Sequence, residues 1–394
     1  MKRSKYMKIT VAGVRKRLTT KINFLGRLFL PLLYVLYKVL FIFLFERSFA
    51  KGELSYLLKE DFTIWKHSMC SMIKEYWTKG RYGFSRRKVV FSFCNSHIKI
   101  IRKTDPCDKN KPIVILCVKN DIRRIQMLVD HYREMGIVKF AILDNESNDG
   151  TFEWMLDQPD IDLYRCSKQY ETNVKEGWIN RLISYYGADR WYILTDSDEL
   201  LVYQGMENNQ ISNLTLHLDI LGVKRVKALT LDTYGKSLFI KESVNLRSDY
   251  RWIDSDSYYE VFGNAGSHRI KRYIGGPRYR LMNSKITLDK HPLVYWEKGT
   301  ISDYAHYQFP HRLINDAPCM LGILHYKFIN TDKQEYMKRA SKGSSFAGKG
   351  TYYRQYMSFF DNQKHQSFMY EGSVEFTSSE VLKRIPFIEC NLPN

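Results

Sequence analysis

The sequence has little cysteine and proline, and its cysteines form no recognisable pattern. Its 394 residues include ten prolines and seven cysteines. The cysteines are scattered, odd in number and without a C-x-x-C pair, at positions 70, 94, 107, 117, 166, 319 and 390. A disulfide framework and a cysteine-based zinc site are therefore excluded, and the pattern suits a reducing compartment.

Acidic residues are also scarce relative to basic ones. There are 42 Asp and Glu against 61 Lys and Arg, which gives a formal net charge of +19. Apolar residues make up 44% and aromatic residues 14% of the chain. This composition excludes a mainly disordered protein and provides material for a large core, either in one catalytic domain with flanking segments or in two domains.

A long uninterrupted hydrophobic run is missing as well. The most apolar stretch, Phe29 to Phe45, contains Pro31 and the charged Lys38, and no small-residue cleavage site of a secretory signal follows it. Residues 1–50 hold eleven Lys and Arg and one acid, Glu46, so they carry +10 of the net charge. We therefore expect residues 1–50 to bind an anionic membrane surface. A core helix and a full membrane span remain as alternatives. A nucleic-acid partner is not expected, because the adjoining run is aliphatic.

The rest of the chain alternates between strand and helix patterns. The patterns predict a β-hairpin within 88–101 in an N-terminal extension (51–110), a sheet domain (111–335) and a C-terminal segment (336–394) with a mobile loop over 341–350. Strands are predicted at 113–118, 138–143, 161–165 and 191–195, with helices after Asp121, over 151–156 and around 179–186. Such alternation predicts an open, mostly parallel α/β sheet flanked by helices.

Three polar clusters follow predicted strands, at the edge where α/β proteins bind ligands. They are Lys119–Asp121, Asp144–Gly150 and Asp196–Glu199. Residues two apart on an extended segment point the same way, so Asp196 and Asp198 are expected to face one ligand. Their oxygens suit Mg²⁺ or Mn²⁺, which commonly neutralise a diphosphate. The turn at 144–151 either binds a nucleoside or is a loop in which Asp149 or Thr151 caps a helix.

Taken together, these motifs resemble the glycosyltransferase family 2-like group of GT-A enzymes. The resemblance rests on a D-N-x-S-x-D-G-T turn at 144–151 and a W-x4-D-x-D-E strand at 191–199. Further matches are V-K-N at 118–120, G-G-P-R-Y-R at 275–280, K-H-P-L-V-Y-W at 290–296 and L-H-Y-K-F at 324–328. It covers roughly residues 111–330 and leaves out the N-terminal segment and the last sixty residues or so.

The resemblance implies a GT-A fold and a role for each matching residue. The nucleotide-sugar would be bound by Lys119, Asn120, Asp144, Asp149, Asp196, Arg278 and Arg280. Mn²⁺ or Mg²⁺ would be held by Asp196, Asp198 and His325. From the residues alone, His325 is better explained as a core histidine on an apolar strand, and both arginines can belong to the excess surface charge. Lys290 and Lys327 are weaker phosphate-binding candidates.

The implied reaction is transfer of a sugar, with inversion, from a nucleotide-sugar to an acceptor hydroxyl. It requires neutralisation of the leaving diphosphate and a carboxylate base at the opposite face of the sugar. The candidates for the base are Asp232, Asp254, Asp256 and Asp303, and we favour Asp254 or Asp256 because Trp252, Tyr258 and Tyr259 lie near them in sequence.

Three other functions compete with this one. They are an aspartyl phosphatase with Asp196 as nucleophile, a non-catalytic glycan-binding or scaffolding protein at a membrane, and a nucleic-acid-binding module. For the transferase we expect a glycan or glycolipid acceptor, a role in bacterial lipopolysaccharide or capsule synthesis, and a place on the cytoplasmic face of the inner membrane. A Golgi-type enzyme is the alternative if Phe29–Phe45 spans the membrane.

Overall fold

The computed structural model describes most of the chain from residue 96 onward. The described residues are 96–104, 108–237, 245–265, 268–304, 306–309, 319–329, 351–361 and 367–389, with the single positions 89, 92, 93, 243, 311, 336 and 337. All of them belong to one compact unit, residues 60–394.

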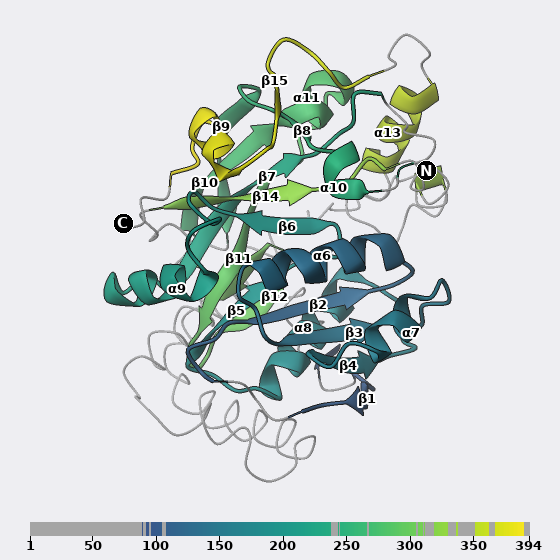
Figure 1. Ribbon diagram of the computed structural model, residues 1–394, viewed down its shortest axis with the longest axis vertical. Coiled ribbons are helices and arrows are strands. Elements are labelled where there is room, and N and C mark those ends of the chain that lie inside the picture. Colours follow the sequence, from purple (N-terminus) through teal and green to yellow (C-terminus); the bar gives the residue numbers. More distant parts are fainter. Residues whose placement is uncertain are drawn as a thin grey trace, which may run out of the picture. The chain divides into compact units, whose positions relative to one another are not determined.

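A large sheet runs through these described residues (Figure 1). Its nine strands lie in the order β1-β4-β3-β2-β5-β11-β7-β14-β6. Their bounds are β1 Lys99–Arg102, β2 Ile113–Val118, β3 Phe140–Asp144, β4 Ile161–Arg165, β5 Arg190–Leu194, β6 Glu199–Val202, β7 Arg225–Asp232, β11 Asp289–Trp296 and β14 Met320–His325.

Six of these nine strands point the same way, and β1, β6 and β11 oppose them. The carboxyl ends of the six strands therefore meet at one edge of the sheet. Because β6 and β11 run in the opposite direction, they bring their first residues to that same edge. Residues from both ends of strands are thus gathered there.

Helices cover both faces of the sheet. They are α6 Ile122–Glu134, α7 Thr151–Leu156, α8 Thr172–Ser184, α9 Ile211–Ile220, α10 Leu246–Asp249, α11 Gly276–Met282 and α13 Thr351–Asp361, followed by the 3-10 helix η3 Ser379–Arg384. Alternate side chains of β2 pack on opposite faces of the sheet. Val114 and Leu116 pack in one core cluster with α6 and α9, whereas Ile113 and Ile115 pack in a second with α8. This explains why β2 is a continuous apolar run.

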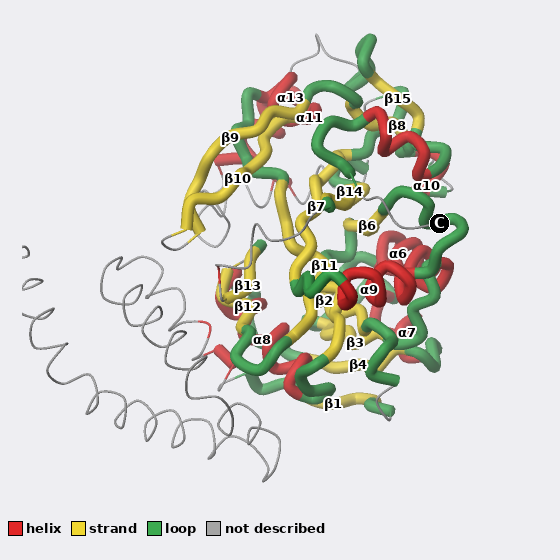
Figure 2. The backbone as a smooth tube through the Cα atoms, turned by 90° about the vertical axis from the view of Figure 1, so that its left-hand side faces the viewer, coloured by secondary structure: helices red, strands yellow, loops and turns green. Residues whose placement is uncertain are grey.

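Among the described residues, three two-stranded pairs lie outside the main sheet, and Figure 2 shows β9 and β10 as a long projecting hairpin. They are β9 Tyr258–Ala265 with β10 His268–Gly275, β12 Ile301–Tyr304 with β13 Tyr307–Phe309, and β8 Trp252–Asp254 with β15 Ser373–Glu375. Near β8, an aromatic cluster joins α13 to the loop after β14, through Phe328, Tyr356, Phe359 and Phe368.

The predicted α/β class is confirmed as a mixed structure with a large, mostly parallel sheet flanked by helices. The predicted hairpin within 88–101 is not found among the described residues. Val89, Ser92 and Phe93 are helical, and β1 pairs with β4 instead. The reason is tertiary, since Arg102 at the end of β1 donates to the carbonyls of Leu156 and Ile161 around the start of β4.

Membrane contact was predicted for residues 1–50 and mobility for residues 341–350. Both segments lie outside the described residues. Within the described part of the chain, no helix has the length and apolar character needed to cross a membrane.

One buried histidine ties α6 to β6. His131 is 5% exposed, and its Nε2 lies 2.7 Å from the carbonyl oxygen of Leu201. Its burial lowers the pKa of the imidazole to about 4, with the nearby positive charge of Arg247 adding to this and the bond to Leu201 opposing it. The neutral ring thus fixes β6, the strand that starts with Glu199, against α6.

We predict that this histidine makes folding sensitive to mild acid. The unfolded chain takes up a proton below the ordinary pKa of about 6.5, whereas the folded chain resists until about pH 4. The contribution of the neutral His131 to stability is complete above pH 6.5 and is lost as the pH falls. The loss of stability relative to neutral pH is about 2 kcal/mol at pH 5.

The free energy of unfolding in urea, measured from pH 7.5 to 4.5, tests this. His131→Gln retains a donor for the Leu201 carbonyl, so the variant's stability is expected to fall less steeply with pH than that of the wild type. If the free energy of unfolding fell equally steeply with pH in both proteins, the predicted role of His131 would be contradicted.

Candidate functional site

Loops from three strand ends are joined by hydrogen bonds at the carboxyl edge of the sheet. The Asn120 amide donates to Ser147 Oγ (2.9 Å), and the Asn148 amide donates to Asn120 Oδ1 (2.8 Å). On the other side, the Ser197 hydroxyl donates to Asp121 Oδ2. The loops after β2, β3 and β5, in which the sequence predicted the three polar clusters, therefore form one continuous surface.

The acidic motif after β5 is a turn rather than an extended segment. The Glu199 amide donates to the carbonyl oxygen of Asp196 at 3.1 Å, which closes the turn. Asp196 and Asp198 consequently have different neighbours, and the expectation that they point the same way from an extended strand is not met.

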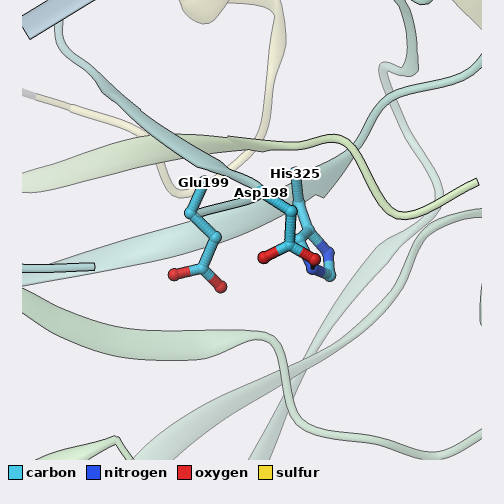
Figure 3. A group of neighbouring side chains, drawn as sticks. All are labelled: Asp198, Glu199 and His325. Atoms are coloured by element: carbon cyan, nitrogen blue, oxygen red, sulfur yellow. Dashed lines mark ion pairs between the residues drawn. The ribbon is translucent and has the colours of Figure 1, made fainter. Parts of the chain in front are cut away.

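Asp198 forms a cluster with Glu199 and His325 (Figure 3). Each residue contributes one potential ligand atom, and these atoms lie within 4.8 Å of one another. His325 ends β14 and pairs in register with Glu199, which begins the antiparallel β6. Asp198 is partly accessible, with 19% of its side chain exposed, whereas His325 (8%) and Glu199 (4%) are buried. Two carboxylates and an imidazole suit Mn²⁺ better than Mg²⁺, so the residues present fit a divalent cation.

Asp232 and Arg278 lie behind this cluster. Asp232 ends β7 opposite His325 in the register, and its Oδ1 lies 2.7 Å from His325 Nδ1. Its Oδ2 accepts from Arg278 Nε at 2.6 Å. The bond at Nδ1 fixes the imidazole so that Nε2 faces Asp198 at 3.3 Å, the arrangement in which a second carboxylate orients a metal-binding histidine.

Neighbouring charges affect the pKa values of Asp198 and His325 more than burial does. Burial by itself raises the pKa of Asp198, but His325 and Lys327, whose Nζ lies 3.8 Å away, outweigh it and hold that pKa well below its usual range. Burial by itself lowers the pKa of His325, but Asp198 and Asp232 reverse the effect and raise it. Without a cation, a proton on His325 therefore stabilises the cluster, and that proton competes with metal binding.

Asp196, predicted to be a metal ligand, contacts lysines instead. Its carboxylate pairs with Lys175 on α8 and, at 3.1 Å, with Lys290 on β11. Lys290 also lies 2.5 Å from Glu199 Oε1. Lys175 was not among the predicted site residues, because nothing in its own stretch of sequence connects α8 with the turn at 196–199.

The predicted nucleotide-binding residues lie on the joined loops, in different environments. Lys119 and Asn120 are exposed, and Asn120 has the left-handed φ of 51° that asparagine tolerates. Asp144 is fully buried, accepts from the Ser147 amide at 3.2 Å and faces Arg165 Nε at 3.5 Å. Asp149 accepts from the amides of Thr151 (3.1 Å) and Ile122 (3.2 Å), so it links the turn to α6.

The two arginines predicted to clamp phosphate are occupied by buried carboxylates. Arg278, 4% exposed, pairs with Asp232 as described, and Arg280 donates from Nε and Nη2 to Asp254, at 3.1 Å each. The G-G-P-R-Y-R motif forms the short helix α11 rather than a loop, which turns both guanidinium groups inward. They are therefore not positioned as a free phosphate clamp.

Two of the four base candidates, Asp232 and the favoured Asp254, are also enclosed. Asp232 is 0% exposed between Arg278 and His325. Asp254 is 0% exposed, and besides Arg280 it accepts from the hydroxyls of Tyr234 (2.7 Å) and Ser257 (2.6 Å). A carboxylate with these partners is not placed to take a proton from an acceptor hydroxyl.

The third candidate, Asp256, is exposed but lies elsewhere. It bonds to the Tyr370 hydroxyl and lines an open cavity of about 850 Å³ together with Gln204 and residues 383–389. Gln204 follows the end of β6, whereas the acidic cluster is at its beginning, and none of Asp198, Glu199 and His325 lines this cavity.

Comparisons with known proteins give no family for this chain. No profile of a known protein family and no curated protein sequence matches it. Among solved structures, the mannosyltransferase PcManGT from Pyrobaculum calidifontis, in complex with GDP-Man and Mn²⁺, is similar over 45% of this chain and 48% of its own, with 15% identity and a TM-score of 0.25. The present chain thus spans about half of that protein.

HddC from Yersinia pseudotuberculosis is similar over 57% of this chain and 96% of its own, with 10% identity and a TM-score of 0.29. Likenesses of this size carry no functional argument, so the function has to come from the site itself.

We predict that Asp254 stabilises the fold. Asp254→Ala leaves the Arg280 guanidinium without its buried partner and is expected to lower the free energy of unfolding by about 3 kcal/mol. Asp256→Ala removes an exposed carboxylate two positions away and is expected to change it by less than about 0.5 kcal/mol. Urea unfolding of both variants measures the difference, and equal stabilities would contradict the structural role of Asp254.

Proposed function

We propose that this protein is a divalent-cation-dependent glycosyltransferase that moves a sugar from a nucleotide-sugar to an acceptor hydroxyl. The observation that supports it most is the arrangement of His325, with Nδ1 held by Asp232 at 2.7 Å and Nε2 directed at Asp198 at 3.3 Å, beside Glu199. This donor set lies at the sheet edge where α/β proteins bind ligands, next to the loops that carry Asn120 and Asp144.

The proposed roles follow from the contacts. Asp198, Glu199 and His325 hold the cation, which when bound neutralises charge on the leaving diphosphate. Asp232 and Arg278 orient His325 from behind. Lys119, Asn120 and the turn that starts at Asp144 face the nucleoside. The acceptor base is left unassigned, because Asp232 and Asp254 are enclosed and Asp256 lines a separate cavity.

The finer parts of the proposal concern the reaction's outcome and setting. We propose inversion at the anomeric carbon, a glycan or glycolipid acceptor, and a place at the cytoplasmic face of a bacterial membrane, in lipopolysaccharide or capsule synthesis. The support for the membrane is the basic, apolar composition of residues 1–50. The anomeric configuration of the product and the binding of the full chain to anionic vesicles are the corresponding tests.

The cation site is testable before any acceptor is known. Mn²⁺ is expected to raise the melting temperature of the full chain, because it binds the folded state alone. Asp198→Asn removes the charged oxygen that faces His325 and is expected to weaken Mn²⁺ binding by roughly tenfold or more, as measured by calorimetry. Asp130→Asn, at a site with a 62% exposed side chain on α6, serves as the matched control and is expected to bind Mn²⁺ like the wild type.

Turnover distinguishes an enzyme from a binding protein with the same site. Slow hydrolysis of a nucleotide-sugar that needs Mn²⁺ and disappears in Asp198→Asn is the expected result. Mn²⁺ binding without any hydrolysis or transfer, across a panel of nucleotide-sugars and glycan acceptors, would favour the non-catalytic glycan-binding alternative.

A further inference from the structure

Two lysines from distant parts of the chain converge on one carboxylate beside the cation cluster. Lys175 comes from the first turn of α8 and Lys290 from the start of β11, and both Nζ atoms contact Asp196. The lysine side chains are only 15% and 16% exposed, whereas Asp196 is 34% exposed. The most accessible member of the group is therefore the anion, and the two cations lie beneath it.

Burial restricts both lysines, and Lys290 has an anchor besides Asp196. They belong to elements on different parts of the fold, and their mostly buried side chains have few alternative rotamers left. Lys290 has a second anchor in Glu199 Oε1 at 2.5 Å. A pair of fixed ammonium groups retains its affinity for an anion, because little side-chain entropy remains to be lost on binding.

The start of α8 adds to the positive potential at this point. The helix has 13 residues, its N-cap residue Glu171 makes no capping bond through its side chain, and its first turn holds no acidic residue. The partial positive charge of the helix N-terminus is therefore added to that of Lys175, and the exposed carboxylate of Glu171 offsets part of it.

We propose that Lys175 and Lys290 bind the diphosphate of the donor, and that Asp196 occupies this anion position while the donor is absent. The inference rests on the proposed function and makes it more specific. A diphosphate carries more negative charge than one carboxylate and offers several acceptor oxygens, so it displaces Asp196 from the two ammonium groups. Asp196 then acts as a competitor of the substrate phosphates, and not as one of the cation's ligands.

The two possible roles of Asp196 predict opposite effects of Asp196→Asn on the affinity for a diphosphate. If Asp196 were a metal ligand, Asp196→Asn would weaken diphosphate binding, and only when the cation is present. If Asp196 holds the place of the diphosphate, Asp196→Asn removes the competing charge and strengthens binding even without a cation.

Calorimetric titration of the full chain with inorganic pyrophosphate, in a chelator and at low salt, measures this directly. We expect Asp196→Asn to bind several-fold tighter than the wild type. Lys175→Met and Lys290→Met are expected to bind roughly ten- to a hundredfold more weakly, since each loses one charge-assisted contact. Lys271→Met, at a 58% exposed lysine on β10, is the matched control and is expected to bind like the wild type.

Asp196→Asn removes the negative charge that both ammonium groups contact, so the folding of the variant is checked by thermal unfolding. Asp196→Ser is the replacement if Asp196→Asn does not fold. Weaker or unchanged pyrophosphate binding in the folded variant, or unchanged binding in both lysine variants, would overturn the inference. Unchanged Mn²⁺ binding in Asp198→Asn would instead contradict the proposed cation site while leaving the lysine pair in place.

Discussion

The compensation of buried and partly buried carboxylates by cations from distant segments is the constraint that organises this site. Asp232 depends on Arg278, Asp198 on His325 and Lys327, and Asp196 on Lys175 and Lys290. A carboxylate removed from water without such a partner costs several kcal/mol, so these pairs hold β6, β7, β11, β14 and α8 in one arrangement. The same pairs keep a dense group of ionised oxygens available at the edge of the sheet.

Strand direction is what allows so many charges to meet. In a purely parallel sheet, only the residues that follow strands would reach this edge. Here β6 and β11 run against their neighbours. Glu199, at the start of β6, therefore pairs with His325 at the end of β14, and Lys290, near the start of β11, reaches Glu199 and Asp196. The two reversed strands thus supply one carboxylate of the cation cluster and one lysine of the anion position.

Arg278 and Asp254 show how a motif can be conspicuous in sequence for a structural reason. Both lie in polar stretches that resemble a phosphate clamp and a catalytic base, yet each is buried in an ion pair, with Asp232 and Arg280 respectively. Residue type alone does not separate these uses, because the same charge serves either a ligand or a partner inside the protein.

The sequence by itself determined the strand and helix succession from Ile113 to Leu194 and the collection of polar loops at one edge, because apolar periodicity and strand order are local properties of the chain. The class, a mostly parallel α/β sheet flanked by helices, followed from them. Only the tertiary structure decided that the acidic motif forms a turn, that Glu199 joins Asp198 and His325, and that Lys175 and Lys290 meet at Asp196. Those contacts join residues as much as about 130 positions apart, and their geometry depends on strand direction and burial, which no local pattern contains.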